Sequence, residues 1–175
     1  DDLVGMGRTP EFLKAVKPPF ERITYDEALK VLKSKGMELE WGKDLRTLEE
    51  RALTEGKTKP IVVTHYPRVS QAFYKARDPQ HPDLVLAFDV IAGDGVGEVV
   101  GGSERETDLE VIKKSLLEQG EDPRSYEWYL DSRRYGSVQH AGFGMGMERL
   151  IQWICKLEHI RDAVPFPRTP ARSYP

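Results

Sequence analysis

The sequence predicts an α+β fold in which an antiparallel β-sheet is flanked by helices. Short strand-like runs in the middle of the chain are separated only by turn segments, which is typical of hairpins. Helical segments are inserted between groups of strands, so a sheet of alternating parallel units is disfavoured. The length of 175 residues, with 39% hydrophobic and 31% charged residues, is typical of about one globular domain.

The first part of the chain predicts two helices and a strand. Thr24-x-x-Glu27 has the pattern of a capping box, which starts a helix expected to run to about Lys35. A second helix is expected from Leu45 to Leu53. The β-branched run Pro60-Ile-Val-Val-Thr64 predicts a buried strand.

The central part predicts strands joined by turns. A strand is expected to begin at Ala72-Phe-Tyr74, followed by a turn-rich connection over residues 76–83. The next strand is expected from Leu84 to Ile91. After a loop over residues 93–97, Glu98-Val-Val100 should continue as strand into a glycine pair.

The last part predicts three helices and a glycine-rich strand. Thr107-x-x-Glu110 is a second capping-box pattern and should start a helix that ends near Gly120. Asp122-Pro123 combines an N-cap with proline at the first helical position, for a helix to about Arg134. A glycine-rich strand then leads into a final helix from Met147 to Leu157, whose apolar residues repeat at helical spacing.

Composition limits the partners of the chain. The net charge of −3 and the pI near 5.9 give no general attraction to nucleic acid, so any RNA contact must be local. No apolar run approaches the roughly 18 residues that a membrane span requires. The single cysteine, Cys155, excludes an internal disulfide and favours a reducing, cytoplasmic setting.

Two carboxylates and an arginine mark a candidate site on the predicted sheet. Asp89 and Glu98 fall on adjacent strands, and Mg²⁺ bound to phosphates typically takes one or two carboxylates. The alternative is that both are strand carboxylates facing water. Arg105 follows the glycine pair and matches a carboxylate or amide oxygen, although an ion pair with Glu104 or Glu106 is equally compatible with the sequence.

The segment from His140 to Arg149 is the second candidate. Alternate glycines let a ligand lie flat on the backbone, and an arginine on the following helix can stack on an aromatic ring or pair with phosphate. It is not a dinucleotide fingerprint, because Arg149 stands where the third glycine is required. The alternative is a glycine-rich strand packed under a helix.

These motifs resemble those of a known family. Met147-Glu148-Arg149 is similar to the end of the third signature motif of class II aminoacyl-tRNA synthetases, and the whole chain resembles the C-terminal half of the catalytic domain of asparaginyl-tRNA synthetases. Four blocks carry the resemblance: residues 18–25, residues 64–67 with 72–74, residues 97–106, and residues 128–140 continuing through 165–170.

The resemblance implies a role for each candidate residue. Glu98 would bind ATP through magnesium, with Asp89 close to the same ion. Arg105 would hold the side chain of the substrate amino acid, beside Gly101. The ATP site would also be lined by the end of the third motif, with Arg149 stacking on adenine; its residues are Gly146, Met147, Glu148 and Arg149. Glu98 and Arg149 would be the catalytic residues.

The resemblance also implies an activity and partners. We expect ATP-dependent activation of asparagine and its ligation to tRNA(Asn) through an aminoacyl-adenylate. Residues 1–175 would form the C-terminal part of one catalytic domain. The upstream motifs, through which a homodimer forms, and an anticodon-binding domain would lie outside this chain. The substrate ATP and Mg²⁺ would be required, and no membrane would be involved.

Departures from the family pattern leave other functions open. Gln139, Ala141, Glu104 and His65 differ from the usual residues and put the amino-acid specificity in question. An ammonia-dependent asparagine synthetase or an aspartate-activating relative on the same fold is the first alternative. A catalytically silent binding or regulatory paralogue is the second.

Overall fold

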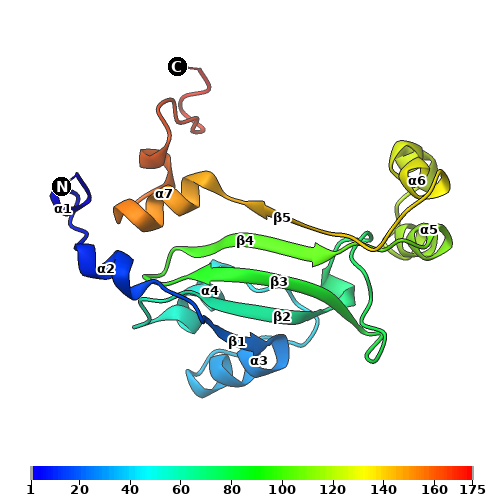
Figure 1. Ribbon diagram of the computed structural model, residues 1–175, viewed down its shortest axis with the longest axis horizontal. Helices are drawn as coiled ribbons and strands as arrows, with labels where there is room; N and C mark the ends of the chain where they lie inside the picture. The colour runs from blue at the N-terminus through cyan, green and yellow to red at the C-terminus, as the bar shows by residue number, and fades with distance from the viewer. Residues whose placement is uncertain (1, 175) are drawn as a thin grey trace.

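The computed structural model describes residues 2–174 and contains a five-stranded mixed sheet (Figure 1). The strands lie in chain order, and neighbours are antiparallel except that β1 runs parallel to β2. Their bounds are β1 Glu21–Thr24, β2 Ile61–Pro67, β3 Leu84–Ala92, β4 Gly97–Glu104 and β5 Ala141–Met145. The predicted α+β class is confirmed, and the short parallel edge strand β1 is an addition to it.

Helices lie at both ends of the sheet and against one of its faces (Figure 1). Figure 1 shows α5 and α6 together at one end of the sheet, and α7 beside α1 and α2 at the other end. The α-helices are α1 Asp2–Gly5, α2 Pro10–Ala15, α3 Tyr25–Ser34, α4 Thr47–Thr54, α5 Leu109–Glu118, α6 Glu127–Arg134 and α7 Met147–Cys155. Three 3-10 helices connect them: η1 Arg68–Ser70, η2 Pro123–Tyr126 and η3 Ile160–Ala163. Within residues 2–174, none of the helices has the length and apolar composition that a membrane crossing requires.

The starts of α3 and α5 test the two predicted capping boxes. The first is confirmed, because Thr24 and Glu27 bind each other's backbone N–H groups. The second is wrong: the N-cap of α5 is Asp108, whose carboxylate accepts hydrogen bonds from the N–H groups of Glu110 at 2.8 Å and Val111 at 3.0 Å. A carboxylate is a stronger acceptor than a hydroxyl and complements the positive end of the helix dipole, so the helix begins one residue after Asp108.

The strand predicted at residues 72–74 is also wrong. The chain there forms only isolated bridges, Lys75 with Arg105 and Arg77 with Val85. Phe73 instead packs edge-on against Tyr126 and Tyr129, in the cluster that joins α5 to α6. This packing holds the segment against the helices, so it does not continue as an extra strand of the sheet.

The main hydrophobic core lies between the sheet and the helices α3 and α4. Its fully buried members come from α3, α4, β2 and β3 and include Tyr25, Leu32, Leu53, Ile61, Tyr66 and Ile91. At the far edge of the sheet the side chains of β5 are uncovered, and Phe143 is 67% exposed. The helices α3 and α4 therefore cover one face of the sheet, and the edge strand β5 stays exposed.

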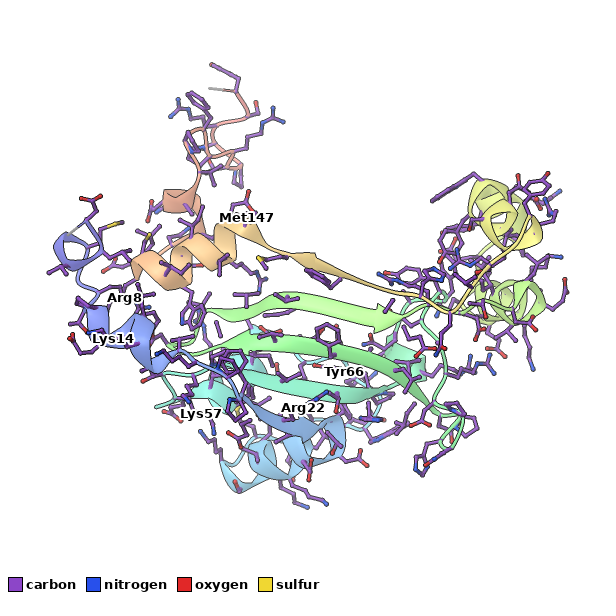
Figure 2. All side chains as sticks on the ribbon, in the orientation of Figure 1. Arg8, Lys14, Arg22, Lys57, Tyr66 and Met147 are labelled. Atoms are coloured by element: carbon purple, nitrogen blue, oxygen red, sulfur yellow. The ribbon has the colours of Figure 1, made fainter. Side chains whose placement is uncertain are left out.

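A smaller core joins the N-terminal segment to α7. Phe12 packs edge-on against Trp153. Arg8, which Figure 2 shows beside this helix, donates to the backbone carbonyls of Trp153 and Ile154 and pairs with Asp94 at 2.8 Å. A buried cation at the C-terminal end of α7 complements the helix dipole there.

Candidate functional site

A β-bulge brings the two candidate carboxylates onto one face of the sheet. Asp89 pairs with Gly101, but two positions further along β3 it is Glu98 that pairs with Ile91, so β4 contains one extra residue. In a regular strand, Glu98 and Gly101 would face opposite sides, because side chains alternate with a period of two. The extra residue turns Glu98 to the face that carries Asp89 and Gly101.

The glycine pair after this bulge has a distinct reason at each position. A Cβ on Gly101 would lie 2.5 Å from Oε1 of Glu98 and 3.1 Å from Oδ1 of Asp89, so both carboxylates converge on this glycine. A Cβ on Gly102 would lie 2.6 Å from the ring of Phe88. Gly101 therefore leaves space for the two carboxylates, and Gly102 for an aromatic ring.

The electrostatics of the pair suit a cation. Burial, with a smaller contribution from the neighbouring Glu98 carboxylate, raises the pKa of Asp89 to about 6 against the opposing effects of the Tyr66 hydroxyl and Lys75. Two carboxylates that share a partly buried space favour a bound positive charge. Among residues 2–174, no group of three or more histidine, cysteine, aspartate or glutamate side chains is arranged to hold a metal. Two carboxylates fit Mg²⁺ that keeps waters and phosphate oxygens as its other ligands.

A cavity of about 510 Å³ opens over this pair. It brings together four residues that the sequence singled out: Asp89, Glu98, Gly101 and Arg105. Sequence reasoning missed the polar residues that line the rest of it, namely Asp44, Gln71, Tyr74 and Lys75. Lys75 donates to Gln71, and burial raises the pKa of Asp44. The lining thus combines the acidic groups Asp44, Asp89 and Glu98 with the cations Lys75 and Arg105.

Arg105 lines the cavity, and two neighbouring side chains hold its guanidinium in place. Its guanidinium donates to Ser103 Oγ at 3.1 Å and lies 4.7 Å from the ring centroid of Tyr74. A Cβ on Gly142 of β5 would lie 3.1 Å from its Nη2, so a larger residue there would press on the guanidinium.

The alternative interpretation of Arg105, an ion pair with Glu104 or Glu106, is not what the structure forms. Glu104 accepts a hydrogen bond from Gln139 at 2.7 Å, and Glu106 accepts from the backbone N–H groups of Thr107 and Asp108. Both carboxylates are therefore engaged elsewhere.

The departures from the family pattern lie outside the cavity lining. Gln139 binds Glu104 as above, and Ala141 is exposed at the start of β5. His65 sits in the irregular part of β2 with a left-handed φ of 58°, where its Nδ1 contacts Thr64 Oγ1 at 2.9 Å. Glu104, one of the residues that put the amino-acid specificity in question, is thus engaged with Gln139 and does not line the cavity.

Of the residues at the end of the third motif, only Arg149 is hydrogen-bonded to a residue that lines the cavity, namely Glu98. From the first turn of α7, its Nη1 donates to the backbone carbonyl of Glu98 at 3.0 Å. Met147, at the junction of β5 and α7 in Figure 2, is 55% exposed. Glu148 is exposed and lines a separate cavity of about 660 Å³ with residues of the C-terminal segment. Gly146 caps α7, and the structure does not bring residues 146–148 into the cavity of Arg105.

Glu50 is a buried residue of this region that sequence reasoning missed. It is 8% exposed, and its Oε2 accepts a hydrogen bond from the N–H of Glu98 at 3.1 Å. Burial raises the pKa of Glu50, and the hydrogen bond and Arg149 oppose this rise. A signal was present in the sequence, because a helix over residues 45–53 places Glu50 on the same face as the apolar Leu53.

The sheet and its helices have the fold of class II aminoacyl-tRNA synthetases. The family model for class II tRNA synthetases of the D, K and N type matches residues 4–170, and the chain belongs to this family. It is 56% identical over 163 residues to the asparagine–tRNA ligase of Pyrococcus horikoshii, an alignment that covers 93% of this chain and 38% of that protein.

Solved structures agree with this assignment. The asparaginyl-tRNA synthetase of Pyrococcus horikoshii complexed with asparaginyl-adenylate superposes with a TM-score of 0.94 at 52% identity, covering 99% of this chain and 40% of that one. The corresponding Entamoeba histolytica complex gives a TM-score of 0.90 at 36% identity, covering 100% and 40%. The chain thus spans about two fifths of the length of these relatives.

Proposed function

We propose that this chain takes part in the ATP-dependent activation of asparagine to asparaginyl-adenylate and its transfer to tRNA(Asn). The observation that carries the proposal is the cavity that joins Arg105 to the carboxylates Asp89 and Glu98 on one face of the sheet. An arginine fork suits the side-chain oxygen of asparagine, and the carboxylate pair suits a hard cation on phosphate oxygens. The same reaction is supported by a relative named asparagine–tRNA ligase and by a similar structure that was solved with asparaginyl-adenylate.

In this proposal the residues act by positioning. Arg105, beside Gly101, holds the asparagine side chain, so that the α-carboxylate of the amino acid is directed at the α-phosphorus of ATP. Glu98 and Asp89 would hold Mg²⁺, which would neutralise charge on the phosphates. The adenine lies against Arg149, with Gly146, Met147 and Glu148 nearby. The carboxylate oxygen forms a bond to phosphorus as pyrophosphate leaves, a displacement that needs positioning and charge stabilisation and no covalent nucleophile.

We also propose the place of this chain in the protein. In this proposal residues 1–175 are the C-terminal part of one catalytic domain, and the share of about 40% of its relatives that the chain spans fits a partial domain. The upstream motifs, the homodimer contacts that they make and an anticodon-binding domain are then supplied by residues outside it. The protein acts in the cytoplasm on tRNA(Asn).

The test is amino-acid-dependent exchange of labelled pyrophosphate into ATP, measured on the full-length protein that carries this chain. We expect exchange with asparagine and Mg²⁺ and little with aspartate. Exchange with aspartate, accompanied by free asparagine when ammonia is added, would support the asparagine synthetase alternative. A folded, dimeric protein that supports neither exchange would be a binding or regulatory paralogue, and the proposal would be wrong.

A further inference from the structure

We propose that Glu50 is a positioning residue for the ATP end of the site. Its carboxylate holds the start of β4 through the N–H of Glu98 and supplies a negative charge beside the guanidinium of Arg149. The inference deepens the proposed function and rests on it for the roles of Glu98 and Arg149. Glu50 belongs to α4, an element outside the sequence blocks that carry the family resemblance.

The first observation is that both polar backbone groups of Glu98 are bound by charged side chains. Its N–H donates to Oε2 of Glu50 at 3.1 Å, and its carbonyl accepts from Nη1 of Arg149 at 3.0 Å. Glu98 stands next to the β-bulge, where the regular ladder of β4 is interrupted. The side chains of Glu50 and Arg149 therefore bind the backbone of Glu98 where ladder hydrogen bonds are interrupted. This fixes the direction in which the Glu98 carboxylate points.

The second observation is that Glu50 and Arg149 meet at the same glycine. A Cβ on Gly97 would lie 2.5 Å from Oε2 of Glu50 and 3.3 Å from Nη1 of Arg149. Gly97 has a left-handed φ of 97°, a conformation that glycine adopts without a steric penalty. Gly97 thus has no side chain at the point where the Glu50 carboxylate of α4 and the Arg149 guanidinium of α7 approach each other.

The third observation is the burial of Glu50. With 8% of its surface exposed, its carboxylate loses most of its hydration, and a buried charge is costly unless it is paired and hydrogen-bonded. An apolar residue of similar size would serve packing equally well there. The carboxylate supplies something that packing does not, namely a fixed negative charge beside Arg149 and an acceptor for Glu98.

The consequence concerns ATP and Mg²⁺ more than asparagine. Without the Glu50 charge, Arg149 keeps its hydrogen bond to the Glu98 carbonyl but loses the attraction of the neighbouring carboxylate, and the N–H of Glu98 loses its charged acceptor. Residues that orient metal ligands in this way are typically worth about 10- to 100-fold in affinity or activity. Arg105 lies at the other end of β4, next to Ser103 and Tyr74, and does not depend on Glu50.

The experiment compares three variants of the full-length protein. Glu50→Gln keeps the volume and one acceptor oxygen but removes the charge, and Glu50→Asp restores the charge on a shorter side chain. Glu55→Gln removes the same charge from the end of the same helix at a surface position paired with Lys35 and is the matched control. The readouts are the KM values for ATP and asparagine in pyrophosphate exchange, the Mg²⁺ dependence, and direct binding of a non-hydrolysable ATP analogue.

We expect Glu50→Gln to raise the KM for ATP by about 10- to 100-fold, with a matching loss of analogue binding and no change in the KM for asparagine. Glu50→Asp should recover part of this loss, and Glu55→Gln should behave like wild type. An unchanged KM for ATP, an equal rise for both substrates, or no recovery in Glu50→Asp would overturn the inference. If the wild type shows no asparagine-dependent exchange, the proposed function fails, and analogue binding alone still decides the role of Glu50.

Discussion

At the scale of single residues, the candidate site depends on where glycines stand. Gly101 leaves room for the Asp89 and Glu98 carboxylates, and Gly142 leaves room for the Arg105 guanidinium. Both glycines lie on the face of the sheet that carries the cavity. The functional side chains thus take the space that a Cβ would otherwise fill, which is a physical reason for the density of glycine in β4 and β5.

Arg105 provides the first residue-scale prediction. Arg105→Lys keeps the charge but loses the planar fork. Because a charge-assisted hydrogen bond is worth about 1.5–3 kcal/mol, kcat/KM for asparagine should fall by about 10- to 150-fold, with the KM for ATP unchanged. The measurement is pyrophosphate exchange at varied asparagine and ATP.

The neighbouring Glu104→Gln is the matched control for Arg105→Lys. Glu104 is bound to Gln139 outside the cavity lining, so the ratio of asparagine to aspartate activation should not change. Near-normal asparagine activation in Arg105→Lys, or a shifted ratio in Glu104→Gln, would contradict this account of the pocket.

Glu98 provides the second residue-scale prediction. Glu98→Gln preserves the backbone bonds to Glu50 and Arg149 but removes a charge that a hard cation requires. The Mg²⁺ concentration for half-maximal exchange should rise by about tenfold or more, while the free energy of unfolding stays close to that of wild type. An unaltered Mg²⁺ titration would show that this carboxylate does not bind the metal.

At the scale of elements, the N-terminus of α5 shows how local chemistry decides a boundary. Two adjacent residues, Thr107 and Asp108, are both suitable caps by composition. The backbone N–H groups of both are bound by Glu106, and the carboxylate of Asp108 reaches the first turn. The helix therefore begins at Leu109.

A pair of alanine substitutions tests this boundary. Asp108→Ala should lower the free energy of unfolding by about 1 kcal/mol, because two N–H groups of the first turn lose their acceptor. Thr107→Ala should have little effect. Urea unfolding monitored by circular dichroism measures both. A larger loss of stability in Thr107→Ala than in Asp108→Ala would contradict this boundary and favour Thr107 as the N-cap, as the capping-box pattern predicts.

At the scale of the whole molecule, much of the architecture follows from local patterns in the sequence. The capping box of α3, the strand β3 and the helix α7 appear where their patterns predict them. The placement of Asp89 and Glu98 on adjacent strands was also predictable from the sequence, whereas their meeting on one face depends on the β-bulge.

Other features depend on contacts that no local pattern specifies. The bulge beside Glu98 depends on the register between β3 and β4, which is set across the sheet. Phe73 leaves the strand pattern because aromatic residues of η2 and α6, distant in sequence, pack against it. The role of Glu50 requires knowing that α4 packs under the start of β4. Long-range packing thus overrides local propensity at these places.

The most direct test of the central claim is a crystal structure of the full-length protein with a non-hydrolysable asparaginyl-adenylate analogue and Mg²⁺. We predict that the asparagine side chain lies within hydrogen-bonding distance of Arg105, in the cavity over Gly101. The metal should lie against Glu98 and Asp89, and the adenine against Arg149. An analogue bound elsewhere, or bound in this cavity with its side chain turned away from Arg105, would contradict the account.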